Sequence, residues 1–228
     1  MKITALILGA GNSSRMKAEK SKMLLEIGGI PVLRRTVEIF EAIDEIEKII
    51  VTARACDKEE FRRILSGVRK PVLITEGGAT RQTSVAGAFR LIDTDTELLL
   101  IHDGARPLVE RETVLNTISC AQRTGAAAVG VPVKDTIKQV NAELEIVATP
   151  ERSTLYSIQT PQIFRCSLYA QALEKAVADG VDLTDDCQLV ERLGAAVTVV
   201  TGAYSNIKIT TQEDIPLAES ILKLRGES

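Results

Sequence analysis

The sequence predicts an α/β fold, a mostly parallel twisted sheet flanked by helices, on the strength of three observations. Strand-like and helix-like segments alternate along the chain. The strand-like segments are apolar on both faces, as in strands that helices cover on both sides. The 228 residues are 45% hydrophobic and 26% charged, a composition typical of a globular protein with a substantial core. We therefore expect a single α/β domain over residues 1–228.

The first half of the chain supplies most of the predicted sheet. Its first segment, Ile3–Leu8, is a short apolar run and predicts a buried strand. Similar runs predict strands at 48–52, 71–75, 97–101 and 126–131. Apolar residues at helical spacing predict helices at 32–43, 57–65, 80–91 and 112–124. In an open sheet of this kind, ligands bind beyond the carboxyl ends of the strands.

The alternation breaks at Lys134–Thr149, where apolar and polar residues are mixed and Asn141-Ala142-Glu143 can form a turn. This pattern predicts a two-stranded ribbon. A lone hairpin is only marginally stable in water, so we expect the ribbon to pack on a second subunit or on its own domain. A last helix begins near Thr211, where Thr-Gln-Glu-Asp resembles a capping box. The remaining patterns predict helices at 167–178 and 184–193 and strands at 197–200 and 206–210.

The composition of the chain argues against some classes of binding partner and indicates a cellular location. The net charge is −3 and there is no long basic tract, which argues against nucleic acid or an anionic membrane as the main partner. No segment approaches the roughly 18 unbroken apolar residues of a membrane-spanning helix, and the first residues lack a signal-peptide pattern. The four cysteines are far apart and form no C-x-x-C pair, so we expect reduced thiols and a cytoplasmic protein.

The segment after the first strand has the features of an anion site. Gly9-Ala10-Gly11-Asn12-Ser13-Ser14 is made of small residues, which let a backbone approach a ligand closely. Four cations follow between residues 15 and 22. Neither familiar phosphate motif fits, because Ser14 stands where a P-loop or a dinucleotide fingerprint needs glycine or alanine. The loop therefore predicts anion binding of another kind.

Two other predicted strands are followed by residues suited to a ligand site. Asp103 follows a buried strand and precedes Gly104, which makes it a candidate metal or nucleotide contact; the alternative is an Asp that only caps its turn. Gly77–Arg81 opens a helix whose N–H groups can face a ligand, with Ser84 one turn further on; the alternative is an ordinary helix entry. We expect a hydrogen-bonded structural role for His102, the single histidine.

Most of the isolated cations are expected on the solvated surface, but Lys208 is less ordinary. It stands between Ile207 and Ile209 in an extended segment. Because side chains alternate in such a segment, Lys208 points away from the apolar face, towards a cleft.

Seven segments carry a family resemblance: GAGNSSRM (9–16), GGATRQTSV (77–85), IHDGARPLV (101–109), VPVKDTIKQV (131–140), TPERSTLYSIQTPQ (149–162), TDDCQLVERLG (184–194) and NIKITTQEDI (206–215). In order and from end to end, they resemble the 2-C-methyl-D-erythritol 4-phosphate cytidylyltransferases of the non-mevalonate isoprenoid pathway. The set is highly specific, although the first loop alone is a weak signal.

The resemblance implies a fold and a reaction. The fold is a Rossmann-like nucleotidyltransferase domain with a protruding β-arm, here residues 134–150, which interlocks with the arm of a second subunit in a homodimer. The phosphate of 2-C-methyl-D-erythritol 4-phosphate attacks the α-phosphorus of CTP with Mg²⁺ or another divalent cation present, and diphosphate leaves. The alternatives are a ribitol 5-phosphate cytidylyltransferase and a catalytically silent nucleotide-binding protein, and the segments at 131–140 and 149–162 fit the first family better than the ribitol one.

The resemblance also implies a role for each matching residue. Arg15 and Lys22 are the catalytic pair, which stabilises charge at the α-phosphorus. Asp103 contacts the metal, and no general base is needed because the nucleophile is already an anion. The nucleotide contacts are Gly9, Ala10, Gly11, Ser13, Arg15, Lys22, Gly78, Ser84, Asp103 and Gly104. The contacts to the polyol phosphate are Arg106, Thr160 and Lys208, with Thr136 and Arg152 supplied by the partner's arm.

The chain departs from the usual family pattern in two places. Ser13 stands where a second glycine is common, which removes a residue that adopts positive φ freely. Ser21 and Met23 flank Lys22 where proline and glutamine are usual, so a rigid φ beside the lysine is lost. We expect activity to survive these changes, with weaker binding of CTP.

Overall fold

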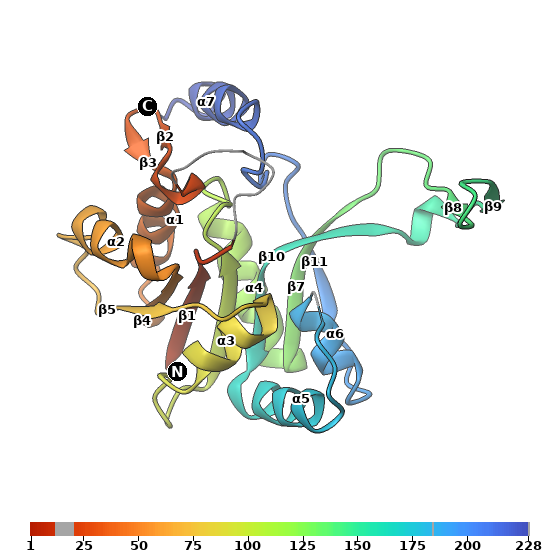
Figure 1. Ribbon diagram of the computed structural model, residues 1–228, viewed down its shortest axis with the longest axis horizontal. Coiled ribbons are helices and arrows are strands. Elements are labelled where there is room, and N and C mark those ends of the chain that lie inside the picture. The colour runs from red at the N-terminus through yellow and green to blue at the C-terminus, as the bar shows by residue number, and fades with distance from the viewer. Residues whose placement is uncertain (12–20, 184, 228) are drawn as a thin grey trace.

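The computed structural model describes residues 1–11, 21–183 and 185–227, and a seven-stranded sheet runs through its centre (Figure 1). The strand order is β11-β7-β10-β6-β1-β4-β5. The bounds are β1 (Ile3–Leu8), β4 (Ile46–Ala53), β5 (Val72–Glu76), β6 (Leu98–Asp103), β7 (Ala126–Pro132), β10 (Tyr156–Arg165) and β11 (Thr198–Thr201).

The sheet is mostly parallel, as the sequence predicts. The pairs β1–β4, β1–β6, β4–β5 and β7–β11 are parallel, whereas β10 runs antiparallel to both β6 and β7. Strand β10 is not predicted by the apolar-run criterion, because it carries polar residues and Pro161 and its first three residues are exposed. It lies near the middle of the sheet and joins the two parallel parts.

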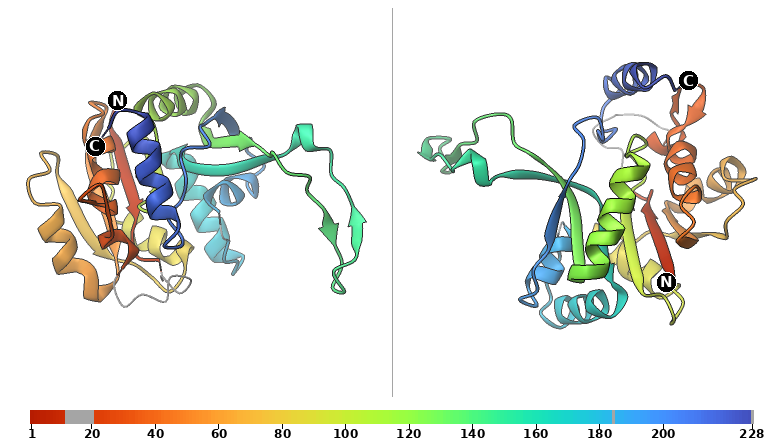
Figure 2. Two further views of the ribbon diagram at one scale, coloured as in Figure 1. Left: turned by 90° about the horizontal axis from the view of Figure 1, so that it is seen from above. Right: turned by 180° about the vertical axis from the view of Figure 1, so that it is seen from behind.

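Helices cover both faces of the sheet (Figure 2). Along β1, Ile3, Ala5 and Ile7 face one apolar cluster with α1, α4 and α7, while Leu6 faces a second cluster with α3, α5 and α6. This alternation explains why both faces of the strand are apolar. The helices are α1 (Val32–Glu41), α2 (Lys58–Ile64), α3 (Arg81–Phe89), α4 (Arg111–Thr124), α5 (Cys166–Ala178), α6 (Asp186–Glu191) and α7 (Asp214–Leu224). Within the described ranges, no helix is long and apolar enough to cross a membrane.

Two predictions near the C-terminus are wrong in detail. Residues 206–210 form an extended loop and no strand, because Ile209 N–H donates to the carbonyl of Ala105 instead of pairing with the sheet. The last helix begins at Asp214 and not near Thr211. The carboxylate of Asp214 accepts hydrogen bonds from the backbone N–H groups of Thr210 (2.6 Å) and Thr211 (2.8 Å), which holds these residues outside the helix.

The predicted two-stranded ribbon is present and leaves the body of the molecule. Residues 133–155, here called the arm, connect β7 to β10 and carry the antiparallel strands β8 (Gln139–Val140) and β9 (Ile146–Ala148). The arm projects away from the sheet and its helices (Figures 1 and 2), so it does not lie on its own domain. Its apolar side chains are exposed, Leu144 by 79% and Ile146 by 62%. A smaller antiparallel pair, β2 (Glu26–Ile27) and β3 (Ile30–Pro31), precedes α1.

Candidate functional site

A cleft of about 750 Å³ opens at the carboxyl ends of four neighbouring strands. Leu8 of β1, Thr52 of β4, Glu76 of β5 and Asp103 of β6 all line it. This is the edge where a parallel sheet is expected to bind a ligand. The predicted nucleotide or substrate residues that line this cleft are Ala10, Gly11, Lys22, Gly78, Ser84, Asp103 and Lys208.

A second hollow, of about 610 Å³, lies among α1, α4 and α7. Its charged lining consists of three arginines and three glutamates, and one pair, Arg225 and Glu110, is joined at 2.7 Å. The opposite charges compensate one another there, and the hollow lies away from the strand ends. The cleft is therefore the better candidate for an anion site.

The loop after β5 forms one wall of the cleft and is held tightly. A Cβ atom on Gly77 would stand 2.2 Å from the Cβ of Ala10, and one on Gly78 would stand 2.3 Å from Thr83 Oγ1, so both positions require glycine. Ser84 Oγ accepts a hydrogen bond from Gly78 N–H (2.9 Å) and donates to the carbonyl of Thr80 (2.8 Å). The predicted pair, Gly78 and Ser84, is thus brought together at the cleft, with the serine fixing the loop.

Asp103 is surrounded by cations. Its Oδ2 lies 2.8 Å from Lys208 Nζ and 3.5 Å from Arg106 Nε. Burial alone would raise the pKa of Asp103, but the charges of Lys208, Arg81 and Arg106 hold that pKa well below its usual range. The carboxylate is therefore ionised at any physiological pH, and it faces the cleft between positive groups.

A buried chain of hydrogen bonds supports Asp103 from behind. The carbonyl of Arg106 can only accept, so His102 Nε2, 3.1 Å away, carries the ring proton. Nδ1 then accepts from the hydroxyl of Thr160 at 3.0 Å, and Thr160 Oγ1 accepts from the backbone N–H of Asp103 at 3.0 Å. Burial lowers the pKa of His102 to about 4, so its ring is neutral and structural.

Four predicted contact residues lie just behind the cleft wall. Gly9 N–H donates to the carbonyl of Thr52 (3.0 Å), and Gly104 N–H donates to the carbonyl of Leu8 (2.9 Å), so both donors are already used. Arg106 donates through Nη1 to the carbonyl of Asn206 (2.7 Å), and Thr160 is buried. These residues hold the wall in place, and their contact with a ligand stays a prediction.

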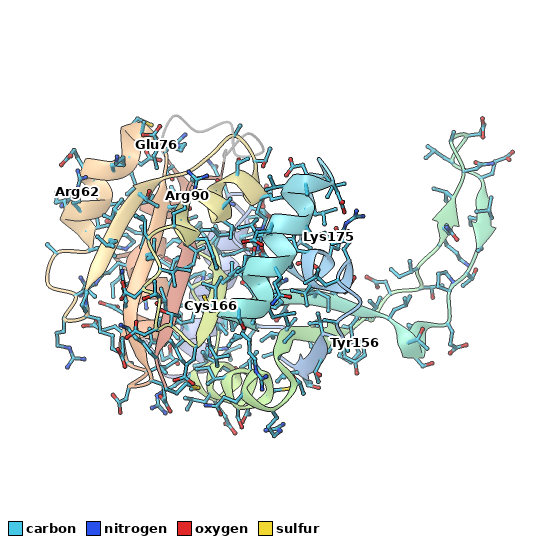
Figure 3. The ribbon with its side chains drawn as sticks, turned by 90° about the horizontal axis from the view of Figure 1, so that it is seen from below. Arg62, Glu76, Arg90, Tyr156, Cys166 and Lys175 are labelled. Atoms are coloured by element: carbon cyan, nitrogen blue, oxygen red, sulfur yellow. The ribbon has the colours of Figure 1, made fainter. Side chains whose placement is uncertain are left out.

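Other predicted residues lie outside the cleft or outside the described residues. Thr136 and Arg152 are exposed on the arm, where Arg152 donates to the carbonyl of Lys134 at 3.0 Å. Figure 3 shows the side chains of the arm projecting into solvent beyond Tyr156, where the arm joins β10. The structure therefore does not bring Thr136 and Arg152 to the cleft of their own chain. Ser13 and Arg15 lie outside the described residues.

Lys22 reaches the cleft from a 3₁₀ turn at Lys22–Leu24. Ser21 is buried, and its hydroxyl accepts a hydrogen bond from the N–H of Met23 at 3.4 Å. The serine thus caps the turn that carries the lysine.

Sequence reasoning missed two cleft cations, Arg54 and Arg81. Arg54 is held by Asp57, with Nε 2.6 Å from Oδ2. Arg81 is the first residue of α3 and forms an ion pair with Asp186. For Arg81, the sequence did offer one indication of a binding role. The residue is a cation in the first turn of a predicted helix, where the helix dipole disfavours positive charge.

Comparison with known proteins gives a consistent result. The family model described as "IspD: 2-C-methyl-D-erythritol 4-phosphate cytidylyltransferase" matches residues 3–224. A protein of that name from Desulforamulus reducens is 43% identical over 98% of this chain and 97% of its own length, and one from Caldanaerobacter subterraneus is 44% identical over 98% and 100%. The crystal structure of 4-diphosphocytidyl-2C-methyl-D-erythritol synthase from Anaerococcus prevotii is 36% identical, with a TM-score of 0.88 over 97% of this chain and 98% of that one. The similarity therefore includes both the body and the arm.

Proposed function

The chain belongs to the 2-C-methyl-D-erythritol 4-phosphate cytidylyltransferase family, and from that premise we propose how its residues bind the two substrates. The enzyme transfers the cytidylyl group of CTP to 2-C-methyl-D-erythritol 4-phosphate in the non-mevalonate route to isoprenoid precursors. The products are 4-diphosphocytidyl-2-C-methyl-D-erythritol and diphosphate. Family membership favours this reaction over transfer to ribitol 5-phosphate and over a catalytically silent nucleotide-binding protein.

The observation that carries the proposal is the group of charges around Asp103 at the carboxyl edge of the sheet. CTP binds between the loops at residues 9–11 and 77–80, whose close approach depends on Gly77. The phosphate of the second substrate binds at Lys208, whose side chain is 40% exposed and lines the cleft. Arg106 lies behind the cleft wall with Nε 3.5 Å from Asp103 Oδ2, and this buried Nε makes no hydrogen bond among the described residues.

Electrostatic stabilisation is the main contribution required from the protein. The attacking phosphate is already an anion, so the reaction needs positive charge and alignment instead of a general base. Lys22 and Lys208 bring ammonium groups to the cleft and offset the charge that gathers at the α-phosphorus. Arg15 is proposed as a third cation on the resemblance alone.

A divalent cation, Mg²⁺, fits the donor set of the cleft. Mg²⁺ commonly takes one or two protein carboxylates and completes its shell with water and substrate phosphates. In the part of the chain that the structure describes, no three acidic, His or Cys residues are placed so that they could hold a metal ion together, but Asp103 supplies one ionised carboxylate. Asp103 would hold the ion, which when bound would offset part of the negative charge of the triphosphate.

The arm is proposed to make a homodimer and to complete the partner's cleft. Thr136 and Arg152 face solvent on their own chain, and the apolar residues Leu144 and Ile146 are exposed among the residues that the structure describes. A second copy of the chain supplies both an apolar surface for the arm and a cleft for Arg152. A cytoplasmic location stays a prediction from the cysteines, all four of which are unpaired.

Mixed dimers test the arm proposal directly. One chain carries Arg152→Ala and the other Lys208→Met, so a mixed dimer has one site with an intact cleft and an intact arm. With the polyol phosphate below its KM, random exchange of subunits should restore about a quarter of the wild-type rate, since half of the dimers are mixed and each has one intact site. A rate no higher than the average of the two parents would place Arg152 outside the partner's cleft.

A substrate assay tests the reaction itself. The wild-type protein is incubated with CTP, Mg²⁺ and either methylerythritol phosphate or ribitol 5-phosphate, and diphosphate release is measured. Release with the first substrate is expected. Release with ribitol 5-phosphate alone would reverse the substrate assignment, and release with neither would favour a silent protein.

A further inference from the structure

Arg81 is a cleft cation that is held from behind by a buried acid. Its Nη1 bonds to Oδ2 of Asp186, the first residue of α6, which lies 105 positions further along the chain. Asp186 is 1% exposed, and its other oxygen accepts a hydrogen bond from the hydroxyl of Tyr169 at 2.6 Å. Tyr169 is itself fully buried against Phe89 and Phe164.

This arrangement is hard to explain by stability alone. A buried ion pair loses hydration that its mutual attraction barely offsets, and apolar residues of similar size often serve as well. The first turn of a helix also disfavours a cation. Burial alone would lower the pKa of Arg81, but the negative charges of Asp186 and Asp103 together raise it, so the guanidinium remains charged. Within the described residues only Nη1 has a hydrogen-bond partner, which leaves Nε and Nη2 for a ligand.

The segment before α6 fixes the neighbours of Arg81 as well. Thr80 donates through its hydroxyl to Asp182 Oδ1 at 3.0 Å. Gln82 donates through Nε2 to the carbonyl of Val181 at 2.9 Å and accepts from the N–H of Leu183 at 2.8 Å. Three consecutive residues at the start of α3 are thus tied to residues 181–183 and to Asp186. The wall of the cleft that carries Gly78 depends on this segment for its position.

We propose that Asp186 and Tyr169 are positioning residues that hold the Arg81 guanidinium in the cleft, where it binds a phosphate of CTP. The planar fork of a guanidinium matches phosphate oxygens and is most useful when its orientation is fixed. The inference rests on the proposed function, because it requires CTP to occupy this cleft. It adds a cation on the α3 side of the cleft to those contributed by Lys22 and Lys208.

Steady-state kinetics on purified variants tests the inference. Asp186→Asn keeps an acceptor for the tyrosine hydroxyl but removes the charge that orients Arg81. It should raise the KM for CTP about tenfold and leave the KM for methylerythritol phosphate within twofold. Arg81→Gln should raise the KM for CTP and the inhibition constant of diphosphate by a similar factor. The double variant should be no worse than Arg81→Gln, because Asp186 acts through Arg81.

Two further variants complete the test, one as a matched control and one as a milder change at the same site. Asp179→Asn makes the same chemical change in an exposed ion pair with Arg192, and it should alter neither KM. Tyr169→Phe removes only the hydroxyl and should raise the KM for CTP about threefold, which serves if Asp186→Asn does not fold. An unchanged KM for CTP in Arg81→Gln, Asp186→Asn and Tyr169→Phe, additive effects in the double variant, or an unchanged inhibition constant of diphosphate in Arg81→Gln would overturn the inference. The proposed function fails separately, if Lys208→Met retains wild-type kinetics.

Discussion

Lys208 and Arg152 are both cations predicted to bind the same substrate, yet their surroundings in the structure differ. Lys208 lies 2.8 Å from Asp103, on a segment that Asn206 ties to Thr160 and Arg106. Arg152 contacts only the backbone of its own arm, at the carbonyl of Lys134, among the described residues. The cleft is assembled by the sheet of one chain, whereas the arm leaves its apolar side chains and Arg152 exposed, as its proposed role on a second chain requires.

The largest expected effect belongs to the cleft. Asp103→Asn should lower kcat about 10²–10³-fold, because it removes the carboxylate around which the cations gather. Asp95→Asn is the matched control, since Asp95 precedes the other end of the same strand β6 and pairs with Lys2 on the surface. Turnover assays on the two folded variants measure the difference. A loss of less than tenfold for Asp103→Asn would show that the charge group of the cleft is not the catalyst.

The second expected effect is a pH dependence of stability, and it comes from His102, which is buried behind Asp103. The pKa of His102 is about 4 in the folded chain and 6.5 at its ordinary value, so between these values only the unfolded chain binds the proton. Stability therefore falls as pH falls through this window, by about 3 kcal/mol in all, since a pKa difference of one corresponds to about 1.4 kcal/mol.

Urea unfolding of the wild type and of His102→Gln, measured between pH 7 and pH 4, isolates this contribution from that of the carboxylates. The variant should show a flatter dependence on pH by the same amount. Parallel curves for the two proteins would mean that the ring is protonated in the folded state as well.

The sequence predicts the frame of the cleft well for a physical reason. Strands buried on both faces must be apolar, so β1, β4, β6 and β7 stand out, and the residues at their carboxyl ends are then expected to converge. Asp103, Gly78 and Lys208 were found in this way or by resemblance. Strand β10 was missed because polar residues and Pro161 interrupt its apolar run.

Contacts between distant segments could not be predicted from local patterns. The pair of Arg81 and Asp186 joins positions 105 residues apart, and nothing in either neighbourhood indicates the other. The same limit applies to the arm. Its ribbon is predictable from the mixed pattern at 134–149, but that pattern does not predict which surface, if the arm makes a dimer as proposed, the ribbon would contact.

The third effect tests the arm as a substrate-binding part. Arg152→Ala should raise the KM for methylerythritol phosphate about tenfold, with kcat and the KM for CTP nearly unchanged, because it removes uniform binding of one phosphate. Lys138→Ala is the control from the same arm, since Lys138 bonds to Thr149 within the ribbon at 2.8 Å. An unchanged KM in the Arg152 variant would show that this cation faces no substrate, and the arm would then be only a dimerisation element.

The smallest expected effect separates the two regions by their packing. Ile146 of β9 is 62% exposed and Ile50 of β4 is fully buried, although both are isoleucines in strands. Ile50→Ala should lower the free energy of unfolding by about 2–5 kcal/mol, because it leaves a cavity in the core. Ile146→Ala should change it by less than about 0.5 kcal/mol at protein concentrations low enough for monomers.

At high concentration the wild type should gain stability that the Ile146 variant lacks, because only a dimer buries this side chain. Urea midpoints measured at several concentrations decide the matter, and midpoints that do not depend on concentration in either protein would remove the arm from the interface between subunits.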